Sequence, residues 1–165
     1  MENLQNNQSD ILKKHIRDFL KNPPHLLQNF HHEDILAFLE LGVEERFALG
    51  DIVLAEGEYV NSAYLVADGK VSVWKDNIEL ATLEKSSFLG ETFLFSKNNR
   101  MAKIICESDC ILLKYERYTV LNYFRKRPEK LFNIFTKNII EIQQKKISNM
   151  NIQLYNLKKR ILNKK

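Results

Sequence analysis

The sequence predicts a mainly β protein with flanking helices (α+β): a double-stranded β-helix or jelly roll with N-terminal helices and a long C-terminal helix. Between residues 46 and 115, short β-rich runs are broken by turn residues at frequent intervals. On both sides of this region, apolar residues recur at helical spacing. We expect three parts: an N-terminal helical extension over residues 1–29, a β-roll over residues 30–127, and a helical tail over residues 128–165.

Two helices are expected before the strands. Ser9 is a suitable N-cap for the first helix, and Pro23-Pro24 ends it. Its apolar face comprises Ile11, Leu12, Ile16, Phe19 and Leu20. The second helix is expected over about His32 to Leu41, and Gly42 is expected to close it.

The β region is divided by turn residues. The turns are expected at Gly50, Gly57, Gly69, Asp76-Asn77 and Ser108-Asp109. The last of these lies between Cys106 and Cys110, where we expect a β-hairpin. Two reduced thiols are the preferred interpretation of these cysteines, and a redox pair is the alternative.

After residue 115 the helical period returns. A short helix is expected over Val120 to Phe124, and Pro128 is expected to open a long helix. Its first turns are expected to pack on the β-roll through Leu131, Phe132, Phe135 and Ile139. Further along, a heptad pattern contains Ile140, Ile147, Met150, Leu154, Leu157 and Ile161. This pattern predicts a homodimer joined through the helix, and the alternative is that the stripe packs on its own β-roll.

One segment has the residues needed to hold an anion. It runs from Phe88 to Phe95 and is followed by Arg100, Met101 and Ala102. Gly90 allows the backbone to approach a ligand, and the first amides of a short helix after it point outward. Arg100 offers a planar fork for phosphate oxygens, and Glu91 accepts hydrogen bonds from hydroxyl groups. Together these groups fit a sugar phosphate.

This arrangement resembles the phosphate-binding cassette of cyclic nucleotide-binding domains, as in catabolite activator-type regulators and the regulatory subunits of cyclic-nucleotide-dependent kinases. The resemblance covers residues 30–147 and includes the glycine turns that precede the cassette. It implies that Glu91 binds the ribose 2′-hydroxyl, that Arg100 binds the cyclic phosphate, and that amides near Thr92 and Phe93 bind the remaining phosphate oxygen. It also implies a site that includes Gly90, Met101 and Ala102, with Leu80 and Leu83 lining the ribose and base pocket.

Three residues depart from the family's pattern. The family usually has a small residue where Phe93 stands, a Ser, Thr or Ala at Met101, and a Gly at Ser86. We expect Phe93 to narrow the approach to the phosphate. The resemblance therefore implies a regulatory sensor of cyclic AMP or cyclic GMP that acts through an effector protein. The alternative is a degenerate module that binds no nucleotide and serves as a dimeric interaction module.

Other function classes receive less support. No catalytic residue, metal ligand set or cofactor is expected, because the sequence has no nucleophile elbow or Walker-type loop and all four histidines precede the strands. The net charge of +4 is concentrated in lysines near the end, without room for a helix-turn-helix, so nucleic acid is not an expected partner. No signal peptide or transmembrane segment is expected. We expect a cytoplasmic location.

Overall fold

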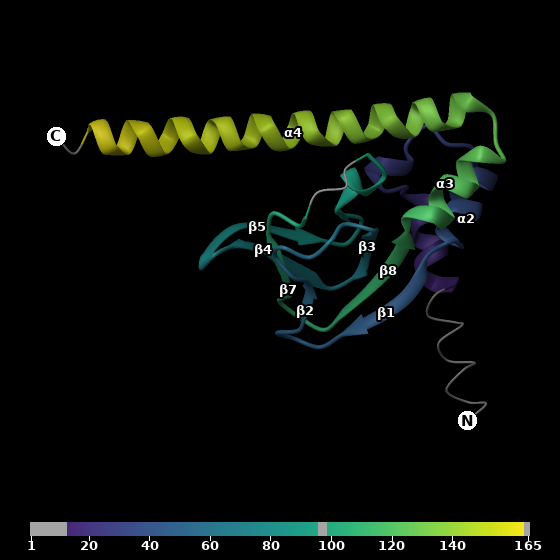
Figure 1. The fold of residues 1–165 in the computed structure, drawn as a ribbon, viewed down its shortest axis with the longest axis horizontal. Helices are drawn as coiled ribbons and strands as arrows, with labels where there is room; N and C mark the ends of the chain where they lie inside the picture. The colour runs from purple at the N-terminus through teal and green to yellow at the C-terminus, as the bar shows by residue number, and fades with distance from the viewer. Residues whose placement is uncertain (1–12, 96–98, 164–165) are drawn as a thin grey trace.

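Two four-stranded antiparallel sheets form a roll, with the helices gathered at one side of it (Figure 1), in the computed structural model, which describes residues 13–95 and 99–163. A helix over residues 13–21 is followed by η1 (His25–Leu27) and α2 (His32–Leu39). The strands are β1 (Val43–Phe47), β2 (Ile52–Leu54), β3 (Ser62–Asp68), β4 (Lys70–Lys75), β5 (Ile78–Glu84), β6 (Phe88–Leu89), β7 (Lys103–Cys106) and β8 (Cys110–Glu116). The short helix η2 (Glu91–Leu94) follows β6, and α3 (Arg117–Arg125) and α4 (Glu129–Leu162) follow β8.

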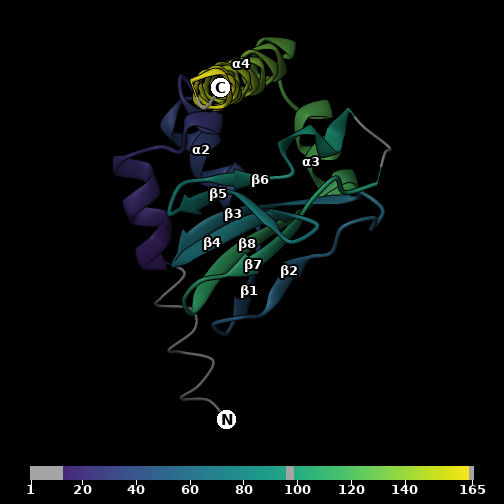
Figure 2. The ribbon, with the colours of Figure 1, turned by 90° about the vertical axis from the view of Figure 1, so that its left-hand side faces the viewer.

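The strand order confirms the predicted β-roll. One sheet has the order β1-β8-β3-β6 and the other has the order β2-β7-β4-β5. The side chains between the two sheets form one apolar core, which includes Leu54, Val66 and Leu112. A second core lies between the first sheet and the helices, where Phe38 stacks on Tyr115 with ring centroids 5.1 Å apart. The predicted helices therefore cover one side of the roll (Figure 2).

Most of the predicted turns occur where the sequence indicated them. Gly50, Gly57 and Gly69 all have a positive φ, and Asp76-Asn77 joins β4 to β5 in a hairpin. The expected hairpin between Cys106 and Cys110 is wrong, because β7 and β8 lie in different sheets and the turn between them crosses from one sheet to the other.

Gly42 follows α2 for a different reason from the one predicted. It is not among the glycines with a positive φ, so it is not a left-handed helix cap. A Cβ atom on it would lie 3.0 Å from the side chains of Leu113 and Tyr115. A side chain at this position would therefore require Leu113 or Tyr115 of β8 to shift by a few tenths of an ångström.

The long helix α4 has two distinct halves. Its first turns contribute Leu131, Phe135 and Ile139 to the core beside η1 and α3, as the sequence predicted, and Phe132 is partly buried there. The buried Asn138 donates hydrogen bonds from Nδ2 to the carbonyl oxygens of Leu26 (2.9 Å) and Gln28 (2.8 Å). From residue 144 to residue 163, by contrast, every residue is exposed. In Figure 1 this second half extends beyond the roll, above the β4–β5 hairpin.

Several remaining predictions concern individual residues. Ser9, Ile11 and Leu12 lie outside the described residues. Cys106 and Cys110 are buried free thiols, and burial together with the neighbouring Cys110 raises the pKa of Cys106 well above its ordinary value. Within residues 13–95 and 99–163, no cluster of three metal-ligating side chains occurs and no helix is long and apolar enough to cross a bilayer.

Candidate functional site

A cavity of about 310 Å3 opens beside the turn between β6 and η2. It is large enough for a small ligand, since ligand pockets commonly occupy about 300–1,000 Å3. Its walls come from both sheets, from the segment before β7 and from α4. The lining residues are Leu54, Val60, Val73, Leu83, Phe88, Leu89, Gly90, Glu91, Thr92, Asn99, Arg100, Met101, Ala102, Ile104 and Lys146.

Gly90 determines the shape of one wall. It caps η2 in the left-handed conformation, with φ 72° and ψ 32°, which favours glycine. A Cβ atom at this position would collide with Nη1 of Arg100. Glycine therefore allows both the turn and the close approach of the guanidinium to the backbone.

Arg100 is a buried cation, with only 8% of its surface exposed. Its Nη2 donates a hydrogen bond to the carbonyl oxygen of Ser62 at 2.7 Å, whereas its buried Nε has no hydrogen-bond partner among the described residues. Desolvation lowers the pKa of the guanidinium, and the charge of Glu58 opposes that effect. A buried charge is costly unless it is paired. An anion in the cavity would supply the missing partner.

The backbone around Arg100 holds the side chain in place. Its amide donates to the carbonyl oxygen of Glu58 at 2.7 Å, and its own carbonyl oxygen accepts from the amide of Gly57 at 2.9 Å. These bonds join the segment before β7 to the loop after β2. The guanidinium is thus presented to the cavity by a braced backbone segment.

Glu91 is the acidic group of the cavity and is 4% exposed. Its Oε1 accepts a hydrogen bond from Nε2 of Gln143 at 2.6 Å and forms an ion pair with Nζ of Lys146. Both partners come from α4. The sequence did not indicate these contacts. Gln143 and Lys146 are three residues apart and so share one helix face, but this spacing does not say what the face meets.

Seven of the nine predicted site residues line the cavity: Gly90, Glu91, Thr92, Arg100, Met101, Ala102 and Leu83. Met101 lies at its rim, with 84% of its surface exposed. Leu80 is not in the lining and is 51% exposed, like most residues of β5. Phe93 is also absent from the lining.

Phe93 points away from the cavity. Its ring is fully buried in the core between the helices and the first sheet. The expected narrowing of the phosphate approach by Phe93 is therefore wrong. Its amide is also occupied, since it donates to the carbonyl oxygen of Gly90 at 2.9 Å. In this conformation, the amide of Phe93 forms a hydrogen bond within the turn and not with a ligand.

Ser86 lies in the turn before β6, where the resemblance implied a glycine. It has a φ of 74°, and its amide donates to the carbonyl oxygen of Val66 at 2.9 Å. The turn thus keeps the left-handed conformation that a glycine would adopt without strain. The serine therefore makes this turn more strained than a glycine would, while the backbone keeps the same left-handed conformation.

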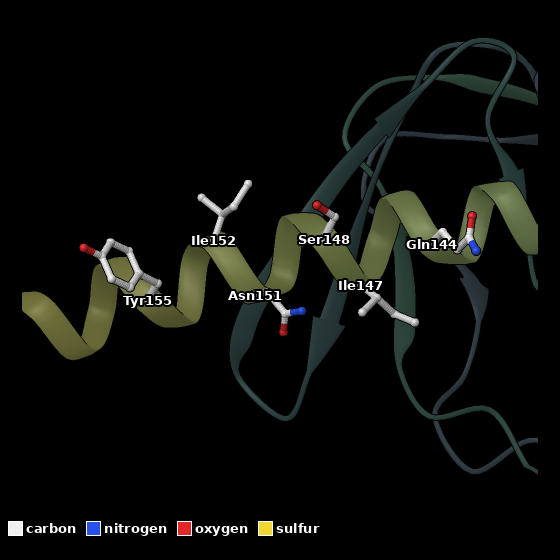
Figure 3. A pocket seen from close by; sticks show the side chains of 6 residues that line it. All are labelled: Gln144, Ile147, Ser148, Asn151, Ile152 and Tyr155. Atoms are coloured by element: carbon white, nitrogen blue, oxygen red, sulfur yellow. The ribbon is translucent and has the colours of Figure 1, made fainter.

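A second hollow, of about 460 Å3, lies along the exposed half of α4. Figure 3 shows its six lining side chains: Gln144, Ile147, Ser148, Asn151, Ile152 and Tyr155. All belong to one helix and all are exposed. No buried charged group faces this hollow, so the cavity beside Gly90 is the better candidate site.

Known proteins resemble this chain across the roll. The family model described as cyclic nucleotide-binding domain matches residues 44–127, just over half of the chain. Human cGMP-dependent protein kinase 2 is 27% identical over 126 residues, which cover 71% of this chain and 16% of that kinase. The cAMP-dependent protein kinase regulatory subunit of Hypocrea atroviridis is 32% identical over 65 residues, or 39% of this chain and 14% of that protein.

Solved structures have the same fold. The catabolite activator protein of Thermus thermophilus superposes with a TM-score of 0.69 at 21% identity. The match covers 81% of this chain and 62% of that protein. At this identity the likeness concerns the β-roll and its helices.

Proposed function

The chain belongs to the cyclic nucleotide-binding domain family, and on that premise we propose that its cavity binds cyclic AMP or cyclic GMP and that it acts as a regulatory module. Domains of this family are regulatory rather than catalytic, and no catalytic residue is proposed. Both nucleotides are candidates, because the relatives include a cGMP-dependent protein kinase and a regulatory subunit of a cAMP-dependent protein kinase.

The observation that carries the proposal is the state of Arg100. Its guanidinium is buried beside Gly90, and its Nε has no hydrogen-bond partner among the described residues. We assign the cyclic phosphate to this guanidinium and the ribose 2′-hydroxyl to the carboxylate of Glu91. The apolar walls at Val73 and Leu83 support contact with the ribose and base.

The second half of α4 supports a proposed homodimer. Five of the six apolar heptad residues lie on it, and each is at least 50% exposed: Ile147, Met150, Leu154, Leu157 and Ile161. Residues 144–162 rise over roughly 28 Å at about 1.5 Å per residue, and all of them are exposed. A second copy of this helix would remove the stripe from water.

The rest of the proposal concerns partners and location. Domains of this family are regulatory, so we propose that this one passes its signal by contact and that an effector protein is its partner. The two buried free thiols suit a reducing compartment, which supports a cytoplasmic location. The exposed apolar stripe also favours a second function: a dimeric interaction module that binds no nucleotide.

Thermal unfolding with each nucleotide tests the proposal. A ligand at about 100 times its dissociation constant adds about 2.7 kcal/mol to the free energy of unfolding. We expect cyclic AMP or cyclic GMP to raise the melting temperature, and the linear 5′-monophosphates to have a much smaller effect. Absence of any shift with either cyclic nucleotide at millimolar concentration would favour the interaction module.

A further inference from the structure

The two oxygens of the Glu91 carboxylate have different surroundings. Oε1 accepts a hydrogen bond from Nε2 of Gln143 at 2.6 Å and pairs with the ammonium of Lys146. Oε2 receives no hydrogen bond from the residues that the structure describes, and Glu91 lines the cavity. The charge of this buried carboxylate is therefore balanced by the protein itself, while one oxygen remains for a ligand.

The buried first half of α4 holds both donors in place. The helix is unbroken from Glu129 to Leu162. Its buried Asn138 donates hydrogen bonds to two backbone carbonyl oxygens at η1 and the residue after it. Gln143 follows Asn138 by five residues and Lys146 follows it by eight, which is about 12 Å along a helix. The helix thus places the amide and the ammonium beside the carboxylate without any contribution from a ligand.

We propose that Lys146 and Gln143 widen the ligand class of the cavity, so that it also accepts cyclic nucleotides whose sugar is 2′-deoxyribose. This inference rests on the proposed function of the cavity. Lys146 acts here as a positioning residue: it balances the charge of Glu91 and needs no contact with the ligand. The 2′-hydroxyl of a ribose then adds a hydrogen bond to Oε2 but is not required for binding.

The physical reason is the cost of leaving a buried carboxylate unpaired. A site that binds a hydroxyl through a buried group with no other partner rejects an analogue without the hydroxyl, because the group is then left unpaired. In this protein Glu91 keeps its ammonium and amide partners whichever sugar is bound. The deoxy ligand loses one hydrogen bond of ordinary strength, which corresponds to an affinity about two- to tenfold weaker. A hydrogen bond to an unbalanced charge would correspond to more than about tenfold.

The affinity ratio between two sugars tests the inference in the natural protein. Calorimetry with 3′,5′-cyclic AMP, 3′,5′-cyclic GMP and their 2′-deoxy forms gives the dissociation constants. For the base that binds more tightly, we expect the deoxy form to bind at most about tenfold more weakly than the ribose form. A larger ratio would overturn the inference.

Removal of the ammonium tests the role of Lys146. The side chain of Lys146 is 44% exposed, so its substitution leaves the core intact. Lys146→Met keeps a long side chain but cannot pair with Glu91, and we expect it to raise the deoxy-to-ribose ratio at least about threefold. Lys145→Met is the matched control, because it removes the same charge from an adjacent exposed residue. Lys146→Arg, which can still pair, should keep the natural ratio.

The ratio separates this role from a general effect on the cavity. A substitution that merely disturbs the cavity, or a lysine that binds the ligand directly, changes the affinity for both sugars by the same factor and leaves their ratio unchanged. Circular dichroism checks that every variant folds. Equal ratios in Lys146→Met and Lys145→Met would show that Lys146 does not act through Glu91.

The inference and the proposed function fail in different ways. If calorimetry detects no binding of either ribose form, the proposed function is wrong and the inference falls with it. If the ribose forms bind but the deoxy forms bind more than about tenfold more weakly, the cavity is functional and only the inference is wrong.

Discussion

Gly90 and Arg100 occupy neighbouring positions that only a glycine allows, because a Cβ atom on residue 90 would collide with Nη1 of the arginine. The left-handed turn at Gly90 and the buried guanidinium are therefore coupled. Two residues ten positions apart in the sequence define the part of the cavity proposed to hold the phosphate.

Substitution of Gly90 tests this coupling. Gly90→Ala should displace the guanidinium and weaken nucleotide binding by at least about tenfold, which corresponds to about 1.4 kcal/mol. Gly50→Ala is the control, since Gly50 also has a positive φ but has open space around its Cβ position. Both variants should lose about 1 kcal/mol of stability because of the left-handed conformation. Calorimetry should show a binding defect only for Gly90→Ala; equal affinities would contradict the assignment.

Substitution of Arg100 tests the phosphate contact itself. Arg100→Ala should weaken binding at least about tenfold, since a hydrogen bond to a charged group contributes about 1.5–3 kcal/mol. Arg100→Lys keeps the charge but loses the planar fork, so we expect it to restore little of the affinity. Circular dichroism checks that both variants fold. Natural affinity in Arg100→Ala would show that the cyclic phosphate does not bind at this guanidinium.

Substitution of Phe93 tests whether its side chain points into the core and away from the cavity. Because its ring is fully buried in the core, Phe93→Ala should lower the free energy of unfolding by about 3–5 kcal/mol and should not improve nucleotide binding. Met101→Ala, at the exposed rim, should change stability by less than about 0.5 kcal/mol. Denaturant unfolding measures both. A folded Phe93→Ala that binds more tightly would mean that the ring does obstruct the cavity.

The proposed dimer depends on the exposed stripe of α4. Leu154→Glu would bury an unpaired charge at the centre of the seam, so we expect a folded monomer by light scattering. Asn156→Glu introduces the same charge on another face of the helix and should leave the dimer intact. A monomeric natural protein at high concentration, or a dimeric Leu154→Glu, would place the partner surface elsewhere.

We expect the buried His15 to make the free energy of unfolding depend on pH. Burial lowers its pKa from the ordinary 6.5, and the charge of Lys85 lowers it further, against the opposing charges of Asp68, Asp18 and Glu44. The folded protein therefore binds this proton less well than the unfolded chain, so stability should fall as the pH drops below about 6.5. His15→Gln should reduce this slope in denaturant unfolding, whereas exposed His31→Gln should not. An unchanged slope in His15→Gln would contradict the assignment.

The sequence alone determined much of the fold. The glycine turns, the turn at Asp76-Asn77, the long helix after Pro128 and the division of that helix into a buried and an exposed half were all predicted. These features follow from local rules: the backbone freedom of glycine, the fixed φ of proline and the spacing of apolar residues along a helix. The order of Gly90, Glu91 and Arg100 likewise indicated the cavity.

Only the tertiary structure decided where individual side chains point and what they meet. Thr92 lines the cavity while its neighbour Phe93 enters the core, because successive residues of a short helix face different sides. Glu91 meets Gln143 and Lys146, which follow it by 52 and 55 residues. Such contacts depend on how α4 is docked by the core and by Asn138. Local spacing places donors and acceptors on their own elements, whereas the packing between elements determines which of them meet.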